Sequence, residues 1–192
     1  NGRNLKRLTT QSAIYSQPAW SYNSDRIAFL RGTAETYRSS FSGFGSRSRE
    51  DLAWIPADGG EATIIERYKG RTNPHFTKID DRVYLNDDEK LISVRWDGTD
   101  EKVLLEVKGI TTFGSSVHGH DHGALPQEFG EPEDRASTPS IILISPDGKK
   151  ALAKINNDIY SVLIPRFGQT PEISVANADK AAFPASQVTE IG

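Results

Sequence analysis

The chain has 192 residues, of which 36% are hydrophobic and 26% are charged, so it can bury a core and global disorder is not expected. Its net charge of -3 gives no electrostatic reason to expect nucleic acid, because a nucleic-acid-binding protein normally carries a basic face. The lack of cysteine excludes a disulfide framework, a thiolate metal site and a cysteine nucleophile. No apolar run approaches the roughly 18 residues that a spanning helix needs, so we expect no membrane insertion.

The amino-terminal residues predict a strand that leads into a repeating unit. Residues 3–9 precede Trp20 by the length of one strand and one connection. The chain begins at Asn1 and contains no methionine. Because a translated protein starts with Met, we expect a processed product or a piece of a longer polypeptide.

One short pattern occurs three times and predicts three β-hairpins. Residues 20–27, 76–83 and 144–151 align without a gap. In each copy an apolar residue and a hydroxyl residue end one strand, and four polar or turn-favouring residues reverse the chain. A basic residue followed by apolar residues then starts the next strand.

A third and a fourth strand are predicted after each hairpin. The third strands are expected at residues 52–55, 91–94 and 159–162, and the fourth strands at residues 62–65, 102–105 and 172–175. Units of roughly 40 to 50 residues with four short antiparallel strands are typical of β-propeller blades. We therefore predict an all-β fold with about three blades of an incomplete β-propeller.

The repeat divides the chain into blades and insertions. We expect blades at about residues 5–66, 67–107 and 139–176, the start of a further blade at residues 185–192, and insertions at residues 33–50 and 108–138. An arc of this kind leaves terminal blade faces bare, and exposed apolar faces demand a partner. The expected partner is the remaining propeller blades or a second chain.

The first insertion is rich in Gly, Ser and Arg, which predicts a surface loop. Arginine and aromatic residues are interleaved in it, a pattern that suits docking to an acidic protein partner. The residues that we assign to this interaction loop are Arg38, Phe41, Phe44, Arg47 and Arg49. A solvated loop is the plainer alternative, although loops on one rim are where propellers place function.

The second insertion contains three of the four histidines. In an extended segment His118, His120 and His122 lie on one side, because successive side chains alternate. With Asp121 or a distant carboxylate they could bind zinc or nickel. The surrounding sequence is rich in Gly, Pro, Glu and Ser, whereas a functional metal site needs ligands held by a second shell. We therefore favour an adventitious or absent metal site, and expect no cofactor in this chain.

A histidine and four aromatic residues near predicted strand ends have structural explanations. Trp20, Trp54, Phe76 and Tyr160 could form a ligand-stacking platform, but aromatic side chains between blades mostly serve packing. His75 is expected at a rim or blade surface, with the central channel as the alternative. No convergent nucleophile and base can be identified, so the sequence predicts no catalytic residues in this chain.

The hairpins resemble the PxWSPDGxxIAF repeat of TolB-like propellers, as residues 18–29 and 144–151 illustrate. Residues 145–162 and 184–192 are similar to the propeller that precedes the catalytic domain in a group of bacterial amidohydrolase-family proteins. Residues 21–24 and 77–80 depart from the repeat, because they lack its Pro-Asp-Gly turn. The resemblance implies a propeller of six or seven blades when whole, followed by a metal-dependent hydrolase barrel with zinc, in a periplasmic or secreted protein.

Three hypotheses for function remain open. The first is the non-catalytic propeller portion of a larger amidohydrolase-type enzyme, which serves as a scaffold and as a substrate-access or interaction domain. The second is a TolB-like module that binds protein or peptidoglycan-associated partners in the bacterial envelope. The third is metal binding through the histidine loop itself.

Overall fold

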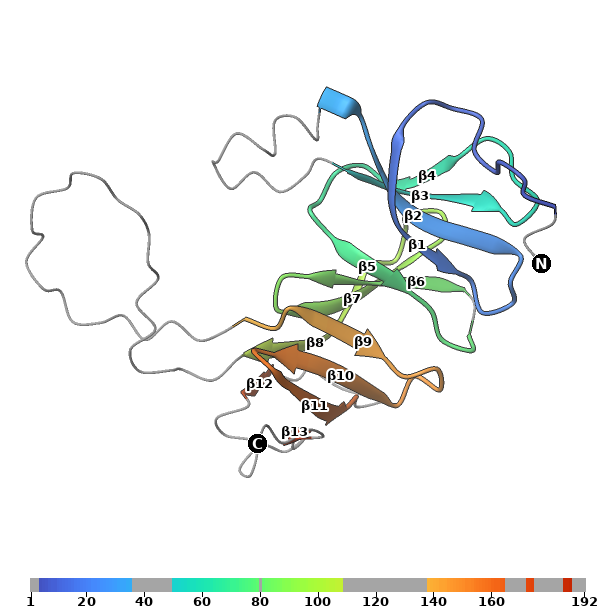
Figure 1. Cartoon of the computed structure of the whole chain (residues 1–192). Coiled ribbons are helices and arrows are strands. Elements are labelled where there is room, and N and C mark those ends of the chain that lie inside the picture. The colour runs from blue at the N-terminus through green and yellow to red at the C-terminus, as the bar shows by residue number, and fades with distance from the viewer. Residues whose placement is uncertain are drawn as a thin grey trace, which may run out of the picture.

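The computed structural model contains three β-sheets that lie side by side, with their first strands gathered at the centre (Figure 1). The structure describes residues 4–35, 50–79, 81–108, 138–164, 172–174 and 185–187. Within these ranges, no helix has the length and hydropathy that crossing a membrane requires. The architecture is all-β, as the repeat predicts.

Each sheet is built from consecutive antiparallel strands, named here in their order across the sheet. The first sheet comprises β1 (Ile14–Trp20), β2 (Arg26–Gly32), β3 (Asp51–Pro56) and β4 (Thr63–Glu66). The second sheet comprises β5 (Thr72–His75), β6 (Arg82–Asp87), β7 (Lys90–Arg95), β8 (Lys102–Lys108) and a short added strand, β12 (Glu172–Ser174). The third sheet comprises β9 (Ile141–Ile144), β10 (Lys150–Ile155), β11 (Asp158–Leu163) and β13 (Ala185–Gln187).

The hydroxyl residue of the repeated hairpin closes the turn. The Ser21 amide donates to the Arg26 carbonyl at 2.9 Å, and the Arg26 amide donates back to Ser21 Oγ at 3.1 Å. Ser145 and Lys150 form the same pair of bonds at 2.7 and 3.0 Å. These bonds lie within a few residues of the turn, which explains why the short pattern is enough to predict the hairpin.

The first turn keeps this geometry without the Pro-Asp-Gly sequence. Gly148 adopts the left-handed conformation at φ 71°, and its amide bonds the Ser145 carbonyl at 2.8 Å. Ser24 stands at the equivalent position with φ 59°, and its amide bonds the Ser21 carbonyl at 3.0 Å. A serine therefore accepts the strained conformation that glycine adopts freely.

The second sheet is buried on both faces, because alternate side chains of its strands point to opposite neighbours. One core joins the first and second sheets and contains Ala28, Leu30, Leu52, Ile65, Val83, Leu85, Ile92 and Val94. Another joins the second and third sheets and contains Tyr84, Leu91, Leu105, Val107, Ile142, Ile144, Ala151, Ala153, Ile155, Tyr160 and Val162. Packing of sheet on sheet therefore supplies most of the buried apolar area.

The outer face of the first sheet is covered by the amino-terminal residues. Leu8 packs against the cluster that contains Ile27 and Phe29, and its carbonyl accepts a bond from the Gly60 amide at 2.9 Å. We predicted a strand here, but among residues 4–13 the structure contains only an isolated parallel bridge from Thr9 to Gly60. One bridge suffices because the segment is held by packing as well.

Two short strands near the carboxyl end differ from the prediction. Residues 172–175 were expected as the fourth strand of the third unit, but β12 pairs in parallel with β8 of the second sheet. Residues 185–192 were expected to start a further blade, but β13 pairs antiparallel with β11 and fills that fourth position. Because β13 occupies the edge of β11, the free edge of β8 is where β12 finds its partner.

The two predicted insertions lie mostly outside the described residues. Of residues 33–50, the structure describes residues 33–35 and Glu50, and Ala34 and Glu35 begin a helical turn. Of residues 108–138, it describes Lys108 and Thr138.

Candidate functional site

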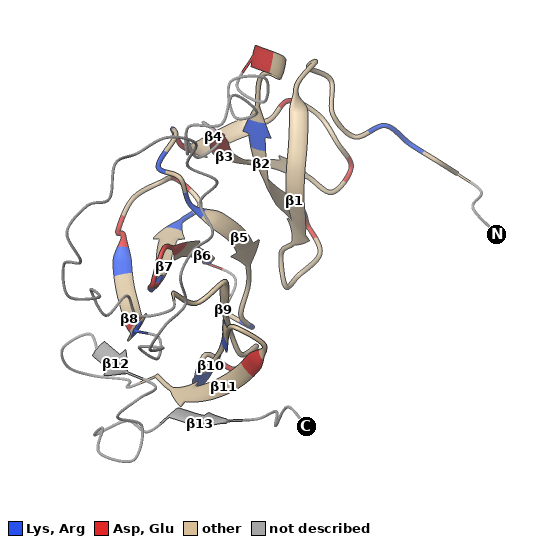
Figure 2. Ribbon diagram, turned by 60° about the vertical axis from the view of Figure 1, so that its left-hand side comes forward, with Lys and Arg blue, Asp and Glu red and all other residues tan. Residues whose placement is uncertain are grey.

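The centre of the molecule is formed by the first strand of each sheet. Strand β1 contacts β5, and β5 contacts β9. None of the three contains Lys, Arg, Asp or Glu, and Figure 2 shows them tan along their length. Charged groups that could bind a ligand therefore come from strand ends, turns and outer strands.

Two of these inner strands carry the same bulge. The pairing register of β1 shifts at Gln17 and that of β5 shifts at Asn73, and each residue has a positive φ, 50° and 55°. The Asn73 amide donates to Gln17 Oε1 at 2.6 Å, so the bulges tie the first sheet to the second. Strained residues at bulges often mark functional positions, but this pair is engaged in joining the sheets.

His75 lies between the second and third sheets and bonds main-chain groups on both sides. Its Nδ1 is 2.7 Å from the Asn73 carbonyl oxygen, and its Nε2 accepts a bond from the Ile144 amide at 3.0 Å. A ring that accepts at Nε2 must carry its proton on Nδ1, so the imidazole is neutral. Burial lowers the pKa of His75 below its ordinary value of 6.5. The expected rim position is thus replaced by a junction between sheets.

Asn86 makes a second junction of the same kind. Its Nδ2 donates to the Ile142 carbonyl at 2.7 Å, and its Oδ1 accepts from the Ile142 amide at 3.3 Å. The outer edge of β9 is thereby satisfied by side chains from the second sheet. Removing either side chain leaves buried main-chain groups without partners.

The stability that His75 contributes is predicted to be lost as the pH falls below about 6.5. Its pKa is lowered in the folded state, so the unfolded chain takes up the proton first and acid favours unfolding. Denaturant unfolding between pH 7.5 and pH 5 measures this loss. His75→Gln keeps an acceptor for the Ile144 amide and should remove this part of the pH dependence.

A variant with alanine at His118, His120 and His122 is the matched control, because it removes the other three histidines and should keep the pH dependence. An unchanged pH profile in His75→Gln contradicts the assignment. His75→Phe should cost about 1–3 kcal/mol at neutral pH, because the Ile144 amide loses its acceptor.

Two adjoining hollows lie where the insertions join the sheets. The larger, about 570 Å³, is lined by Asp87, Asp88, Glu89, Lys90, Glu106, Thr138 and Pro139. The smaller, about 280 Å³, is lined by Glu50, Gly70, Arg71, Thr72, Asn86, Asp88, Pro139 and Ser140. Glu50 directly follows residues 36–49, and Thr138 directly follows residues 109–137. This is the candidate functional site, because its walls adjoin both segments that depart from the repeat.

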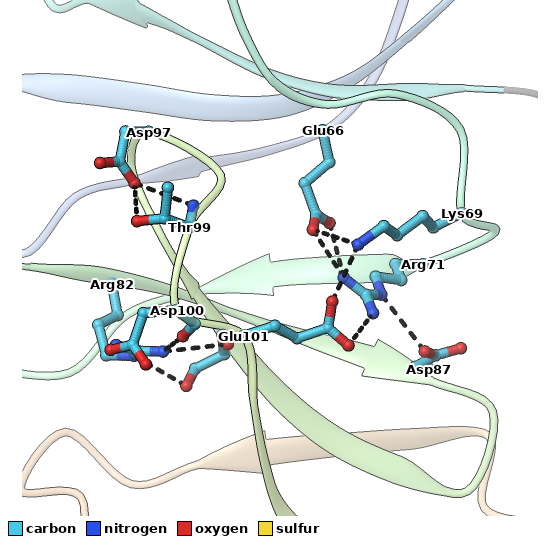
Figure 3. A network of polar contacts seen from close by, with 10 residues as sticks. Glu66, Lys69, Arg71, Arg82, Asp87, Asp97, Thr99, Asp100 and Glu101 are labelled. Atoms are coloured by element: carbon cyan, nitrogen blue, oxygen red, sulfur yellow. Dashed lines mark hydrogen bonds and ion pairs between the residues drawn. The ribbon is translucent and has the colours of Figure 1, made fainter.

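Arg71, the most buried charged group in the smaller hollow's wall, is bound by three carboxylates (Figure 3). Its guanidinium lies 2.7 Å from Glu66 Oε2, 3.3 Å from Asp87 Oδ2 and 2.7 Å from Glu101 Oε1. Lys69 bonds Glu66 and Glu101 at 2.9 Å each. Hydrogen bonds from Arg71 and Lys69 lower the pKa of Glu101 to about 2. The guanidinium is therefore committed to the junction of the first and second sheets.

A second network holds the turn between β7 and β8 (Figure 3). Arg82 donates to Ser93 Oγ at 2.9 Å and to Asp100 Oδ2 at 2.7 Å, and it also bonds the Asp100 carbonyl. The Arg82 bond is the largest cause that lowers the pKa of Asp100. The basic residue of the hairpin pattern thus fixes an outer turn in the second sheet, a role that the pattern did not predict.

An aromatic cluster fills the space between the first and second sheets. Phe76 stacks on Trp96 with ring centroids 5.2 Å apart, and Trp54 meets Trp96 edge-on at 5.9 Å. The Arg26 guanidinium lies 5.0 Å from both tryptophan rings. Packing is therefore the role of Trp54 and Phe76, as expected. Trp20 differs, because it is 55% exposed.

The predicted ligands and loop residues cannot be placed in this site. His118, His120, Asp121 and His122 lie outside the described residues. The same is true of Arg38, Phe41, Phe44, Arg47 and Arg49. In the part of the chain that the structure describes, no group of three or more His, Asp or Glu residues could hold a metal ion. Both assignments stay predictions.

Comparison with known proteins defines the fold. No family model and no curated protein matches the chain. An oligogalacturonate lyase in complex with manganese, a β-propeller, matches with a TM-score of 0.51 and 12% identity, over 82% of this chain and 41% of that chain. The fold is an arc of a β-propeller. Each sheet is one blade, and the chain spans about two fifths of the length of that lyase.

Two further structures are more distant. An oligogalacturonate lyase from Vibrio parahaemolyticus has a TM-score of 0.45 and 12% identity, over 82% of this chain and 32% of that chain. A putative TolB from Agrobacterium tumefaciens has a TM-score of 0.34 and 12% identity, over 83% of this chain and 65% of that chain. At this identity the likeness concerns the fold alone.

Proposed function

We propose that the chain is the non-catalytic propeller portion of a larger metal-dependent hydrolase of the amidohydrolase type. It serves as a scaffold and as an interaction or substrate-access domain. Zinc belongs to the catalytic part of that enzyme, and the protein is periplasmic or secreted. The resemblance of residues 145–162 and 184–192 to the propellers of such enzymes supports the proposal, as does the arc of blades.

The observation that carries the scaffold role is the state of the polar groups in the candidate site. Arg71 is saturated by Glu66, Asp87 and Glu101, and Asn86 is occupied by the backbone of Ile142. A catalytic site needs a nucleophile or base and an electrophilic group directed at a common point. Polar side chains that bond one another across blades instead stabilise the arc.

The test uses the natural polypeptide that contains this sequence. We expect that polypeptide to hold a metal ion and to hydrolyse amide or ester substrates. Alanine at His118, His120 and His122 should leave both properties unchanged, because the chemistry is assigned elsewhere. Loss of the metal and of activity in this variant would instead support the histidine loop as the metal site.

Protein binding without hydrolysis is the second candidate, favoured by Trp20 and Tyr22, which are 55% and 51% exposed. Aromatic residues are enriched in protein interfaces. A polypeptide without hydrolase activity that binds a purified peptidoglycan-associated lipoprotein, and loses this binding in Trp20→Ala, would replace the first proposal by the second.

A further inference from the structure

The third sheet has one face against the second sheet and one open face. Along β10, the residues Ala151, Ala153 and Ile155 are buried against the second sheet. Leu152, between them, points the opposite way and is 44% exposed. The open face is defined by Ile141, Leu143, Leu152, Leu163, Lys150 and Lys154, and no described core cluster includes any of them.

The repeat shows what this position does elsewhere in the chain. Leu152 pairs with Leu143 across β9 and β10, and Tyr84 pairs with His75 at the same register in the second sheet. Tyr84 is buried in the core shared with the third sheet. In the first sheet, Ala28 holds the position and is buried in the core shared with the second sheet. At this register, therefore, each earlier sheet packs on the sheet that follows it.

The polar groups of the open face indicate the chemistry of its occupant. Lys154 stands at the register of Asn86, which bonds the inner strand of the next sheet. A lysine ammonium donates and does not accept. The occupant therefore offers carbonyl or carboxylate oxygens near Lys154 and Lys150, around an aliphatic centre that meets Leu143 and Leu152.

A second copy of this chain is a poor occupant. The face that it would have to present is the outer face of its first sheet, with Ile27 and Phe29. That face is already covered by Leu8, whose carbonyl is bonded to the Gly60 amide. Docking a copy would require the amino-terminal residues to be displaced first.

The course of the chain favours an occupant from the same polypeptide. The outer strand β4 of the first sheet leads through residues 67–71 to β5, the inner strand of the second sheet. Strand β13 occupies the corresponding outer position in the third sheet. We propose that the open face of the third sheet is the docking site of a further four-stranded propeller blade of the same polypeptide. The inference rests on the proposed function in one respect, that the chain is part of a longer propeller.

Cysteine labelling of the natural polypeptide tests the docking, because the sequence printed here contains no cysteine. Leu152→Cys and Leu163→Cys probe the open face, where the native side chains are 44% and 48% exposed. Tyr68→Cys is the matched control, because Tyr68 is 43% exposed in the link between the first and second sheets. With a blade docked, maleimide should modify the two open-face cysteines about 100-fold more slowly than the control. In denaturant the three rates should be equal.

Equal rates at all three positions in the folded polypeptide would overturn the proposal. Protection that disappears on dilution would also overturn it, because it would identify a separate chain or a second copy as the occupant. Two probe positions guard against a variant that fails to fold, which circular dichroism detects. Metal content and hydrolysis are not involved, so failure of the docking and failure of the proposed enzyme are separate results.

Discussion

Replacing Arg71 by methionine is expected to lower the free energy of unfolding by about 3–5 kcal/mol, because it removes one partner from a buried ion pair. The side chains of Arg71 and Glu66 are only 6% and 5% exposed, and two bonds of 2.7 and 2.9 Å join them. Without the guanidinium, Glu66 keeps only Lys69, whose side chain is 45% exposed. Equilibrium denaturation measures the loss, and the melting temperature should fall by roughly 10 °C.

Arg95→Met is the control for this substitution. Arg95 also pairs with an acidic residue, Asp100, at 3.4 Å, but its side chain is 55% exposed. Exposed pairs contribute at most about 1 kcal/mol. Combining Arg71→Met with Glu66→Leu should recover much of the loss, because no unpaired buried carboxylate remains at position 66. Similar losses for Arg71→Met and Arg95→Met would show that burial does not decide the effect.

The second large effect is expected for Gly98→Ala, which should cost about 3 kcal/mol. Gly98 has a φ of +80°, and a Cβ atom built on it would lie 2.3 Å from the carbonyl oxygen of Ile65 in the first sheet. The left-handed conformation accounts for about 1–2 kcal/mol. The remainder arises because the turn after β7 must move away from β4, which loosens packing between the sheets.

Gly148→Ala separates these two contributions. Gly148 has a φ of +71°, but a Cβ atom there would meet nothing within 4 Å. Only the conformational cost of about 1–2 kcal/mol is expected. Thermal unfolding of the two variants gives the comparison. Equal losses would contradict a close contact between Gly98 and Ile65.

Structure within each sheet was predictable where its cause is local. Ser21 and Arg26 close the first hairpin by bonds between residues five apart, so turn chemistry and alternation identify the strands. The last strands were assigned differently because β12 and β13 have three residues each. A segment of that length has too little alternation to fix its partner, and which sheet edge remains open decides the pairing.

The candidate site was much less predictable, because its contacts join residues from different repeats. His75 and Ile144 are 69 positions apart, and nothing in the local sequence of either indicates the other. Arg71 occupies a short link between blades, where a solvated side chain is the usual expectation. Its burial follows from how closely the first and second sheets pack, a property of the assembled arc.

The parallel pairing of β12 with β8 affects how the molecule comes apart. After completing β11 in the third sheet, the chain returns to the second sheet and then goes back to the third as β13. The second and third sheets are therefore laced together by the backbone as well as by their shared core. Detaching the third sheet first would require breaking the β12 ladder, so these two sheets are expected to unfold as one cooperative unit, with slow refolding of the laced segment.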